Sequence, residues 1–172
     1  MLQVAKAAPD FTAEAVFGDE VRKISLSDFR GKWVVLVFYP LDFTFVCPTE
    51  VTAFDVEADK FKEMNTEVLT ISVDSVHSHK AWQKELGNMK LGMVSDMTKE
   101  ISRNYGVLIE EKGHSLRGTF VIDPDGILKM MVVHDNNIGR NVDEIIRVVQ
   151  ACQTGELCPI GWKPGQKTLG KA

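Results

Sequence analysis

The sequence predicts an α/β domain in which helices flank a central mixed β-sheet, and two observations lead to this prediction. Up to residue 105, apolar runs of strand length alternate with amphipathic segments of helical period. A turn-linked pair of strands, at 119–123 and 127–133, then precedes a final helical segment. Alternating strands and helices favour parallel pairing, whereas a hairpin adds antiparallel strands, so the predicted sheet is mixed.

The individual elements follow from local patterns. The apolar run at 34–39 is unbroken and stops at Pro40, which is typical of a central strand buried on both faces. Residues 49–64 change to helical spacing, with apolar side chains on one face and charged side chains on the other. The other expected elements are short strands and a turn within 11–30, a strand at 68–73, and helices at 76–86, 98–105 and 142–151. This order favours a thioredoxin-like arrangement.

Length and composition fit one domain over 1–172, with 153–172 as a C-terminal tail rich in Gly, Pro and Lys. The net charge of −4 argues against a nucleic-acid partner. The longest apolar stretch, 33–39, is far too short to cross a membrane. Because the first ten residues also lack the apolar run of a signal peptide, we expect a cytoplasmic protein.

Three cysteines, an odd number at irregular spacing, do not indicate a disulfide scaffold. Cys152 continues the apolar stripe of the last helix, where a cysteine most often packs as a small buried hydrophobe. Cys158 lies in the Gly- and Pro-rich tail, which predicts a mobile, accessible thiol. A surface cysteine without function is the alternative there.

Cys47 follows a predicted buried strand and precedes a helix whose first turn suits Pro48. Unpaired N–H groups and the positive end of a helix would stabilise a thiolate at that place. The alternative is an inert cysteine followed by a proline. An ordinary thiol is a few per cent ionised at neutral pH, so full ionisation raises the reactive population only about 30-fold. A working site therefore also needs groups that orient a substrate and stabilise charge.

Two candidates precede Cys47. Thr44 lies three residues earlier, so its hydroxyl could face the sulfur if the backbone turns. Pro40 could shield a thiolate from water. The alternatives are that Thr44 caps the helix and that Pro40 only ends the strand.

Three charged candidates complete the set. Arg117 directly precedes the strand that begins at Gly118, and Arg140 precedes the last helix, so both could supply cationic donors. Each arginine taken alone is as well explained as a solvated surface charge. Glu50 could be a first-turn helix acid or the carboxylate that holds an arginine in place.

These residues together resemble the peroxiredoxins. The eight-residue stretch from Pro40 to Cys47, with its Pro-x-x-x-Thr-x-x-Cys spacing, is similar to the family's active-site signature. The resemblance runs from about residue 4 to the C-terminus and includes three further motifs. These are Ser78-His79-Lys80-Ala81-Trp82, Arg117-Gly118-Thr119-Phe120-Val121-Ile122-Asp123 and Gly139-Arg140-Asn141-Val142-Asp143-Glu144. The segment Gly155-Glu156-Leu157-Cys158-Pro159 is similar to that carrying the second cysteine of typical two-cysteine members, such as the peroxidase subunit of bacterial alkyl hydroperoxide reductase.

The resemblance implies a thioredoxin-like fold and a role in cell redox homeostasis, reducing hydrogen peroxide and organic hydroperoxides with no cofactor, metal or haem. It implies that Cys47 becomes a sulfenic acid and that Cys158 of a partner subunit resolves it as a disulfide. It further implies that Thr44 and Arg117 bind the peroxide oxygens, and that the Arg117 charge favours the thiolate. Pro40 would shield the site, Glu50 would position an arginine, and Arg140 would lie behind them.

The implied partners are a homodimer or a ring of five dimers and a thiol reductant protein, either thioredoxin-like or a dedicated flavoprotein. One departure concerns overoxidation. Members sensitive to excess peroxide carry a Gly-Gly-Leu-Gly stretch and a C-terminal Tyr-Phe extension. Here Leu86–Gly92 differs, and the fourteen residues after Cys158 contain neither Tyr nor Phe. We therefore expect fast unwinding around Cys47 and resistance to its conversion to sulfinic acid.

Three other functions are alternatives to a peroxidase. A thioredoxin-type dithiol oxidoreductase needs a Cys-x-x-Cys pair, and Thr44 stands where the first cysteine would be. A zinc site built from Cys152, Cys158 and His134 matches no common finger spacing. An oligomeric chaperone or redox-signalling partner could coexist with peroxidase activity and stays open.

Overall fold

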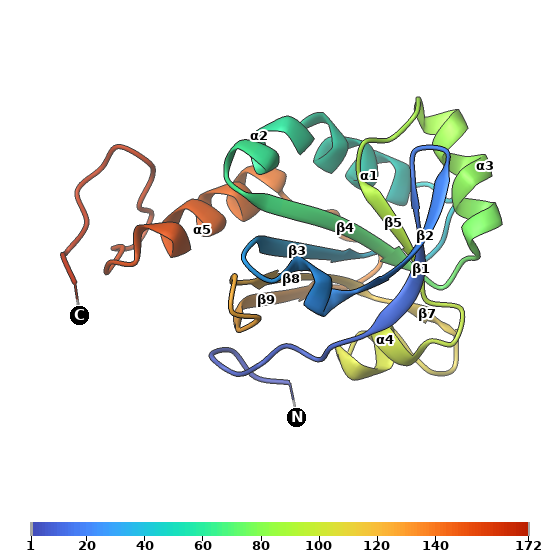
Figure 1. Cartoon of the computed structure of the whole chain (residues 1–172), viewed down its shortest axis with the longest axis horizontal. Helices are drawn as coiled ribbons and strands as arrows, with labels where there is room; N and C mark the ends of the chain where they lie inside the picture. The colour runs from blue at the N-terminus through green and yellow to red at the C-terminus, as the bar shows by residue number, and fades with distance from the viewer. Residues whose placement is uncertain (1, 172) are drawn as a thin grey trace. The chain divides into compact units, whose positions relative to one another are not determined.

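A computed structural model describes residues 2–171 of the chain (Figure 1). The chain divides into two compact units, of which the first ends at Arg140 and the second begins at Asn141. The tail predicted from residue 153 therefore belongs to the second unit, together with the C-terminal helix. That the whole chain acts as one domain stays a prediction.

A seven-stranded mixed sheet forms the centre of the first unit, in the order β2-β1-β5-β4-β3-β8-β9. The strands β3, β4 and β5 are parallel, whereas β8 pairs antiparallel with β3 and β9, and β1 pairs antiparallel with β5 and β2. This confirms the α/β class and the mixed sheet. The bounds are β1 Thr12–Phe17, β2 Glu20–Ser25, β3 Trp33–Phe38, β4 Thr66–Ser72, β5 Gly92–Ser95, β8 Arg117–Ile122 and β9 Leu128–His134.

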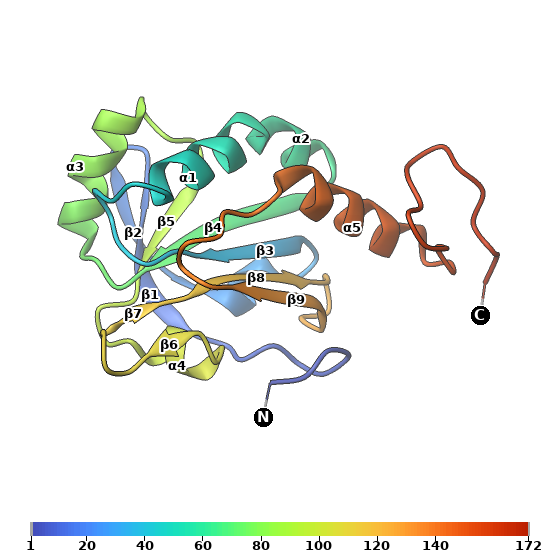
Figure 2. The same ribbon diagram turned by 180° about the vertical axis from the view of Figure 1, so that it is seen from behind.

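Helices cover both faces of this sheet, as Figures 1 and 2 show. On one face, α1 and α3 contribute Cys47, Val51 and Trp82 to an apolar cluster with Val16 and Met93. On the other face, Ile101 of α4 packs in a cluster that includes the β3 side chains Val34, Leu36 and Phe38. The bounds are α1 Cys47–Val56, α2 Ala58–Glu63, α3 Val76–Leu86 and α4 Glu100–Asn104, with a 3-10 turn at Leu26–Phe29 and a small sheet of β6 Leu108–Ile109 and β7 His114–Ser115.

The strand β3 explains why the site lies where it does. All residues from Val34 to Tyr39 are buried, as the unbroken apolar run predicts. Because β3 lies between β4 and β8, both of its edges are paired with neighbouring strands. The chain therefore leaves the sheet only after the last residue of β3. The strand ends at Phe38, one residue earlier than predicted, and Pro40, also buried, lies in the loop that leads to α1.

Two predicted features need correction. The helix expected over 49–64 is divided at Glu57, where the backbone leaves helical geometry (φ −87°, ψ 6°). The apolar stripe survives the break, because Phe54 and Phe61 are both buried and their rings stack 6.2 Å apart. The strand β5 was not foreseen. Its first residue, Gly92, lies so close to Phe17 and Leu69 that a Cβ atom would meet both at under 3 Å.

The second unit contains α5, Val142–Thr154, and the tail that follows it. Asn141 caps the helix, because its side-chain oxygen accepts from the Glu144 N–H at 3.2 Å, and Gly155 ends it with φ +63°. The tail contains no helix or strand through residue 171, but it has internal contacts. The N–H of Leu157 donates to the Gly170 carbonyl at 2.9 Å, and the Leu169 N–H donates back to Leu157 at 2.8 Å.

The helices within residues 2–171 are all too short or too polar to cross a lipid bilayer.

Candidate active site

Cys47 is the first residue of α1 and is fully buried. Pro48 occupies the next position, as predicted, where the N–H that proline lacks would have no partner inside the helix. Cys47 belongs to the apolar cluster of α1 and α3 that also includes Val51 and Trp82. Cys47 and Cys158 are both free thiols.

Arg117, the first residue of β8, is the cation beside the sulfur. Its Nη1 lies 3.4 Å from the Cys47 Sγ and donates to Glu50 Oε2 at 2.7 Å. Its Nε donates to the backbone carbonyl of Asn136 at 2.9 Å, which fixes the plane of the guanidinium. Since Arg117 is only 3% exposed, the surface alternative considered for it is wrong. Its Nη2 forms no hydrogen bond within residues 2–171 and is therefore available to a substrate.

Glu50 joins the two arginines. Its Oε1 accepts from the backbone N–H and the Nε of Arg140, both at 2.9 Å, and its Oε2 accepts from Arg140 Nη2 at 2.8 Å. The Nη1 of Arg140 donates to the carbonyls of Phe38 and Gly118 at 2.8 and 2.9 Å. Arg140 therefore ties the end of β3 to β8 and is no surface charge: its side chain is 1% exposed.

The charges of this cluster leave one positive charge beside the Cys47 sulfur. Burial alone would raise the pKa of Glu50, but the hydrogen bonds and charge of Arg140, and then the charge of Arg117, outweigh burial and lower it below its ordinary 4.5. Glu50 is therefore ionised at neutral pH. Two guanidinium charges then face one carboxylate, and a Cys47 thiolate would bring the cluster to neutrality.

The loop before α1 holds the Thr44 hydroxyl by a local hydrogen bond. The Thr44 hydroxyl donates to the Leu41 carbonyl at 2.9 Å, closing a turn, and makes no hydrogen bond with the sulfur. The capping alternative is also wrong, because Val46 is the residue before α1 and no side chain caps that end. With its proton directed at Leu41, the Thr44 oxygen can only accept from a substrate.

The two cysteines of the second unit resemble each other more than predicted. Cys152 is partly exposed, so its expected burial in an apolar core is wrong: the helical stripe continues to it, but α5 is already near its end there. Cys158 is also partly exposed. Its sulfur lies 3.5 Å from the Thr154 hydroxyl and 3.7 Å from the Ala151 carbonyl, so this thiol is held by local contacts.

Sequence reasoning missed a second buried polar group behind the loop. Tyr39, Asp42 and His79 hydrogen-bond to one another on the side of the loop that faces α3. A signal existed, because Asp42 and His79 both stand inside motifs that carry the family resemblance. The contact of Arg117 with the Asn136 carbonyl had no such signal, since any residue supplies a backbone oxygen.

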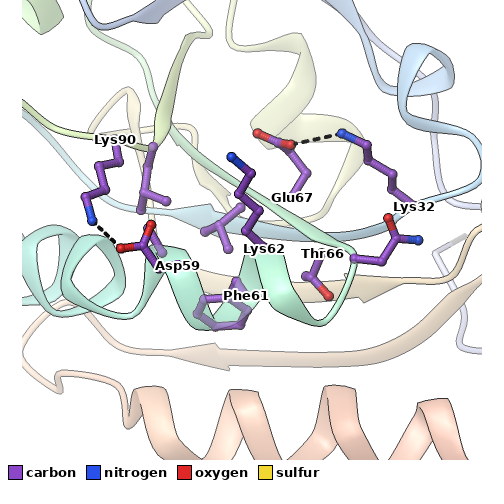
Figure 3. A pocket seen from close by; sticks show the side chains of 11 residues that line it. Lys32, Asp59, Phe61, Lys62, Thr66, Glu67 and Lys90 are labelled. Atoms are coloured by element: carbon purple, nitrogen blue, oxygen red, sulfur yellow. Dashed lines mark hydrogen bonds and ion pairs between the residues drawn. The ribbon is translucent and has the colours of Figure 1, made fainter.

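A separate cavity of about 570 Å³ contains none of these residues (Figure 3). It lies beside α2 and the beginning of β4. Two of its lysines form ion pairs with neighbouring carboxylates: Lys90 with Asp59 at 2.6 Å and Lys32 with Glu67 at 3.7 Å. Its described lining contains no cysteine, so it offers no thiol.

Comparisons with known proteins agree with this geometry. Residues 4–131 match the model of the AhpC/TSA family. The chain is 51% identical to mouse Peroxiredoxin-2, covering 97% of this chain and 89% of that protein. It is also 51% identical to the chloroplastic 2-Cys peroxiredoxin BAS1 of Hordeum vulgare, covering 96% and 84%. The solved structure of reduced Plasmodium vivax 2-Cys peroxiredoxin superposes with a TM-score of 0.92 at 46% identity, over 95% of this chain and 91% of that one.

Proposed function

The chain belongs to the AhpC/TSA family as a two-cysteine peroxiredoxin, a thiol-dependent peroxidase with a thioredoxin-like fold, and from that premise we propose that Cys47 is its peroxidatic cysteine and Cys158 its resolving cysteine. The observation that carries the proposal is the buried contact of Arg117 with both the Cys47 sulfur and Glu50. It places a fixed cation at the sulfur of a cysteine that begins a helix.

In the proposed first step, the Cys47 thiolate attacks one oxygen of a hydrogen peroxide or organic hydroperoxide. An S–O bond forms as the O–O bond breaks, so the sulfur is oxidised to a sulfenic acid and the leaving oxygen takes a proton to become water or an alcohol. The Nη2 of Arg117 would donate to the peroxide oxygens and stabilise the developing charge. The Thr44 oxygen would accept the peroxide O–H, and Pro40 would exclude water.

Glu50 and Arg140 act through Arg117 in this proposal. The carboxylate of Glu50 fixes the Nη1 end of Arg117, and Arg140 in turn fixes the carboxylate from two sides. Within this cluster Arg117 is the group that contacts the sulfur, so we assign Glu50 and Arg140 a positioning role. Their task is to keep Arg117 aligned without reorganisation during the reaction.

In the proposed second step, the thiol of Cys158 from a partner subunit attacks the sulfenic sulfur. The disulfide forms and water leaves, carrying the thiol proton and the sulfenic oxygen. A dithiol reductant protein, thioredoxin-like or a flavoprotein, then returns both cysteines to thiols by exchange. Such a cycle needs a supply of reduced thiols, which supports the cytoplasmic location proposed for the chain.

A homodimer is supported by the edge strands of the sheet. The edge strand β2 carries exposed charged residues, which discourage pairing with another strand. The strand β9 forms the other edge of the sheet (Figure 2). Its residues Met131 and Val133 are 46% and 43% exposed. We propose that a second copy covers β9. The finer proposal, a ring of five such dimers, would use the exposed Phe43 and Phe45 beside the site.

A non-reducing gel after peroxide treatment tests the assignment of the cysteines. We expect the wild type and Cys152→Ser to form a covalent dimer, and Cys47→Ser and Cys158→Ser to remain monomers. Mass spectrometry should find Cys47 joined to Cys158. A dimer that required Cys152, or a bond between Cys152 and Cys158, would contradict the assignment. Holdase activity retained by Cys47→Ser would separate a chaperone role from the peroxidase chemistry.

A further inference from the structure

The loop between β3 and α1 is held unequally along its length. Asp42, near its beginning, is almost fully buried and accepts three side-chain hydrogen bonds: from the Tyr39 hydroxyl at 2.8 Å, the Ser78 hydroxyl at 2.7 Å and His79 Nδ1 at 2.9 Å. Its backbone N–H donates to Asp74 at 2.9 Å. By contrast, Phe45 near the end of the loop is 95% exposed.

His79 connects this loop to the sheet. The imidazole is fully buried, and its Nε2 lies 3.1 Å from the Val94 carbonyl on β5, an atom that can only accept. Its Nδ1 lies 2.9 Å from the Asp42 carboxylate, so both ring nitrogens face oxygen atoms. Asp42 therefore forms a buried pair with a side chain that is itself fixed at its far end.

Tyr39 completes the pair as a permanent donor. Burial, followed by the negative charge of Asp42, raises the pKa of Tyr39 well above its usual value, so the phenol stays protonated. Its ring also packs on Trp82 of α3, with centroids 5.6 Å apart. One face of α3 therefore holds the loop through residues Ser78, His79 and Trp82.

The fixed part of the loop ends at Phe43. This residue has φ +55°, a left-handed conformation that is unusual for a bulky side chain, and its ring lies 6.2 Å from that of Trp82. Beyond it, the Thr44 hydroxyl contacts Leu41 of the same loop and nothing on α3 within residues 2–171. The strained residue thus separates the segment that α3 holds from the segment that leads to Cys47.

We propose that the buried Asp42–His79 pair is the contact that sets how readily the first turn of α1 opens to expose Cys47. The proposal rests on the proposed function, in which a fully buried Cys47 must become accessible to Cys158 of another subunit. Opening would draw residues 42–47 away from α3, so the hydrogen bonds of Asp42 with Ser78 and His79 are present only in the closed form. The pair is a positioning device: it holds the closed form and takes no part in the chemistry.

Weakening the pair should shift the balance between the two fates of the sulfenic acid. The loss of one buried side-chain hydrogen bond of the closed form raises the open population about tenfold. Because the closed form still dominates in the reduced protein, the rate of attack on peroxide should change less than about twofold. After oxidation, the disulfide should form about tenfold more often relative to sulfinic acid.

The test uses the full-length chain with His79→Gln, with Asp42→Asn as a second variant of similar shape. His77→Gln is the matched control, because His77 is exposed on the same helix. Stopped-flow kinetics gives the rate with hydrogen peroxide, mass spectrometry gives the ratio of disulfide to sulfinic Cys47, and far-UV circular dichroism checks folding. If His79→Gln fails to fold, Asp42→Asn provides the test.

The proposal requires a raised disulfide fraction with a nearly unchanged peroxide rate in the folded variants, and no change in His77→Gln. An unchanged ratio, or a ratio and rate that fall together, would overturn it. A wild type that forms no disulfide between Cys47 and Cys158 would instead overturn the proposed function, and this inference with it.

Discussion

Replacing Glu50 by Gln is the sharpest test of the site. The carboxylate accepts four hydrogen bonds, three from Arg140 and one from Arg117, while its side chain is 3% exposed. A glutamine keeps the shape but removes the charge and turns an N–H₂ group toward guanidinium N–H donors. Two buried cations then lose the one anion between them.

The expected cost follows from burial. Removing one partner of a buried, hydrogen-bonded ion network destabilises a protein by about 3–5 kcal/mol, against a total stability of about 5–15 kcal/mol. The peroxide reaction should also slow by about 10- to 100-fold, because Arg117 loses the contact that fixes its Nη1 end beside the sulfur. In Glu50→Gln the free energy of unfolding and the rate with peroxide should therefore both fall. In His79→Gln and Asp42→Asn, by contrast, the rate with peroxide should stay nearly unchanged.

Guanidinium chloride unfolding of the reduced protein at pH 7, at one protein concentration, measures the stability. Glu110→Gln is the matched control, since Glu110 pairs with Arg103 on the surface, where both side chains are half or more exposed. We expect no measurable change in this control. If Glu50→Gln lost no more stability than Glu110→Gln, the claim that the buried cluster organises the site would be wrong.

Three further predictions follow. The lowered pKa of Glu50 means that its contribution to stability is complete above its ordinary 4.5 and is lost as pH falls below that value, so acid unfolding of Glu50→Gln should be less steep than that of the wild type. During turnover with millimolar peroxide, mass spectrometry should find Cys47 mostly as disulfide; mostly sulfinic Cys47 would contradict the expected resistance. Met131→Glu on β9 should shift sedimentation toward monomer, and an unchanged dimer would place the interface elsewhere.

The order of elements was predictable because burial leaves a simple pattern in the chain. The run at 34–39 is apolar at every position since β3 lies inside the sheet with a helix on each face. The α3 bounds of 76–86 followed from helical spacing and the glycine after it, which has φ +101°. The four-residue β5 was missed because it is too short to show a period, and its pairing partners are distant in sequence.

The identity of the site residues was also readable, but their contacts were not. Thr44 stands at the expected position in the signature, yet its hydroxyl contacts Leu41 and not the sulfur, because turn closure competes locally for its proton. Cys152 lies on the predicted stripe but is only partly buried. Side-chain burial depends on what packs against a helix end, and helical spacing contains no information about that.

The sequence by itself determined the fold class, the family and the cysteine at the start of a helix, since these depend on periodicity, turn residues and a local motif around Cys47. Only the tertiary structure decided how Arg117 and Arg140 are used. Residues 50, 117 and 140 are far apart in the chain, and each arginine alone has the sequence context of a surface charge. Folding brings both arginines onto the buried carboxylate of Glu50. Because buried charges are costly without a partner, the arginines must pair there. Two cations on one carboxylate leave one positive charge beside the sulfur.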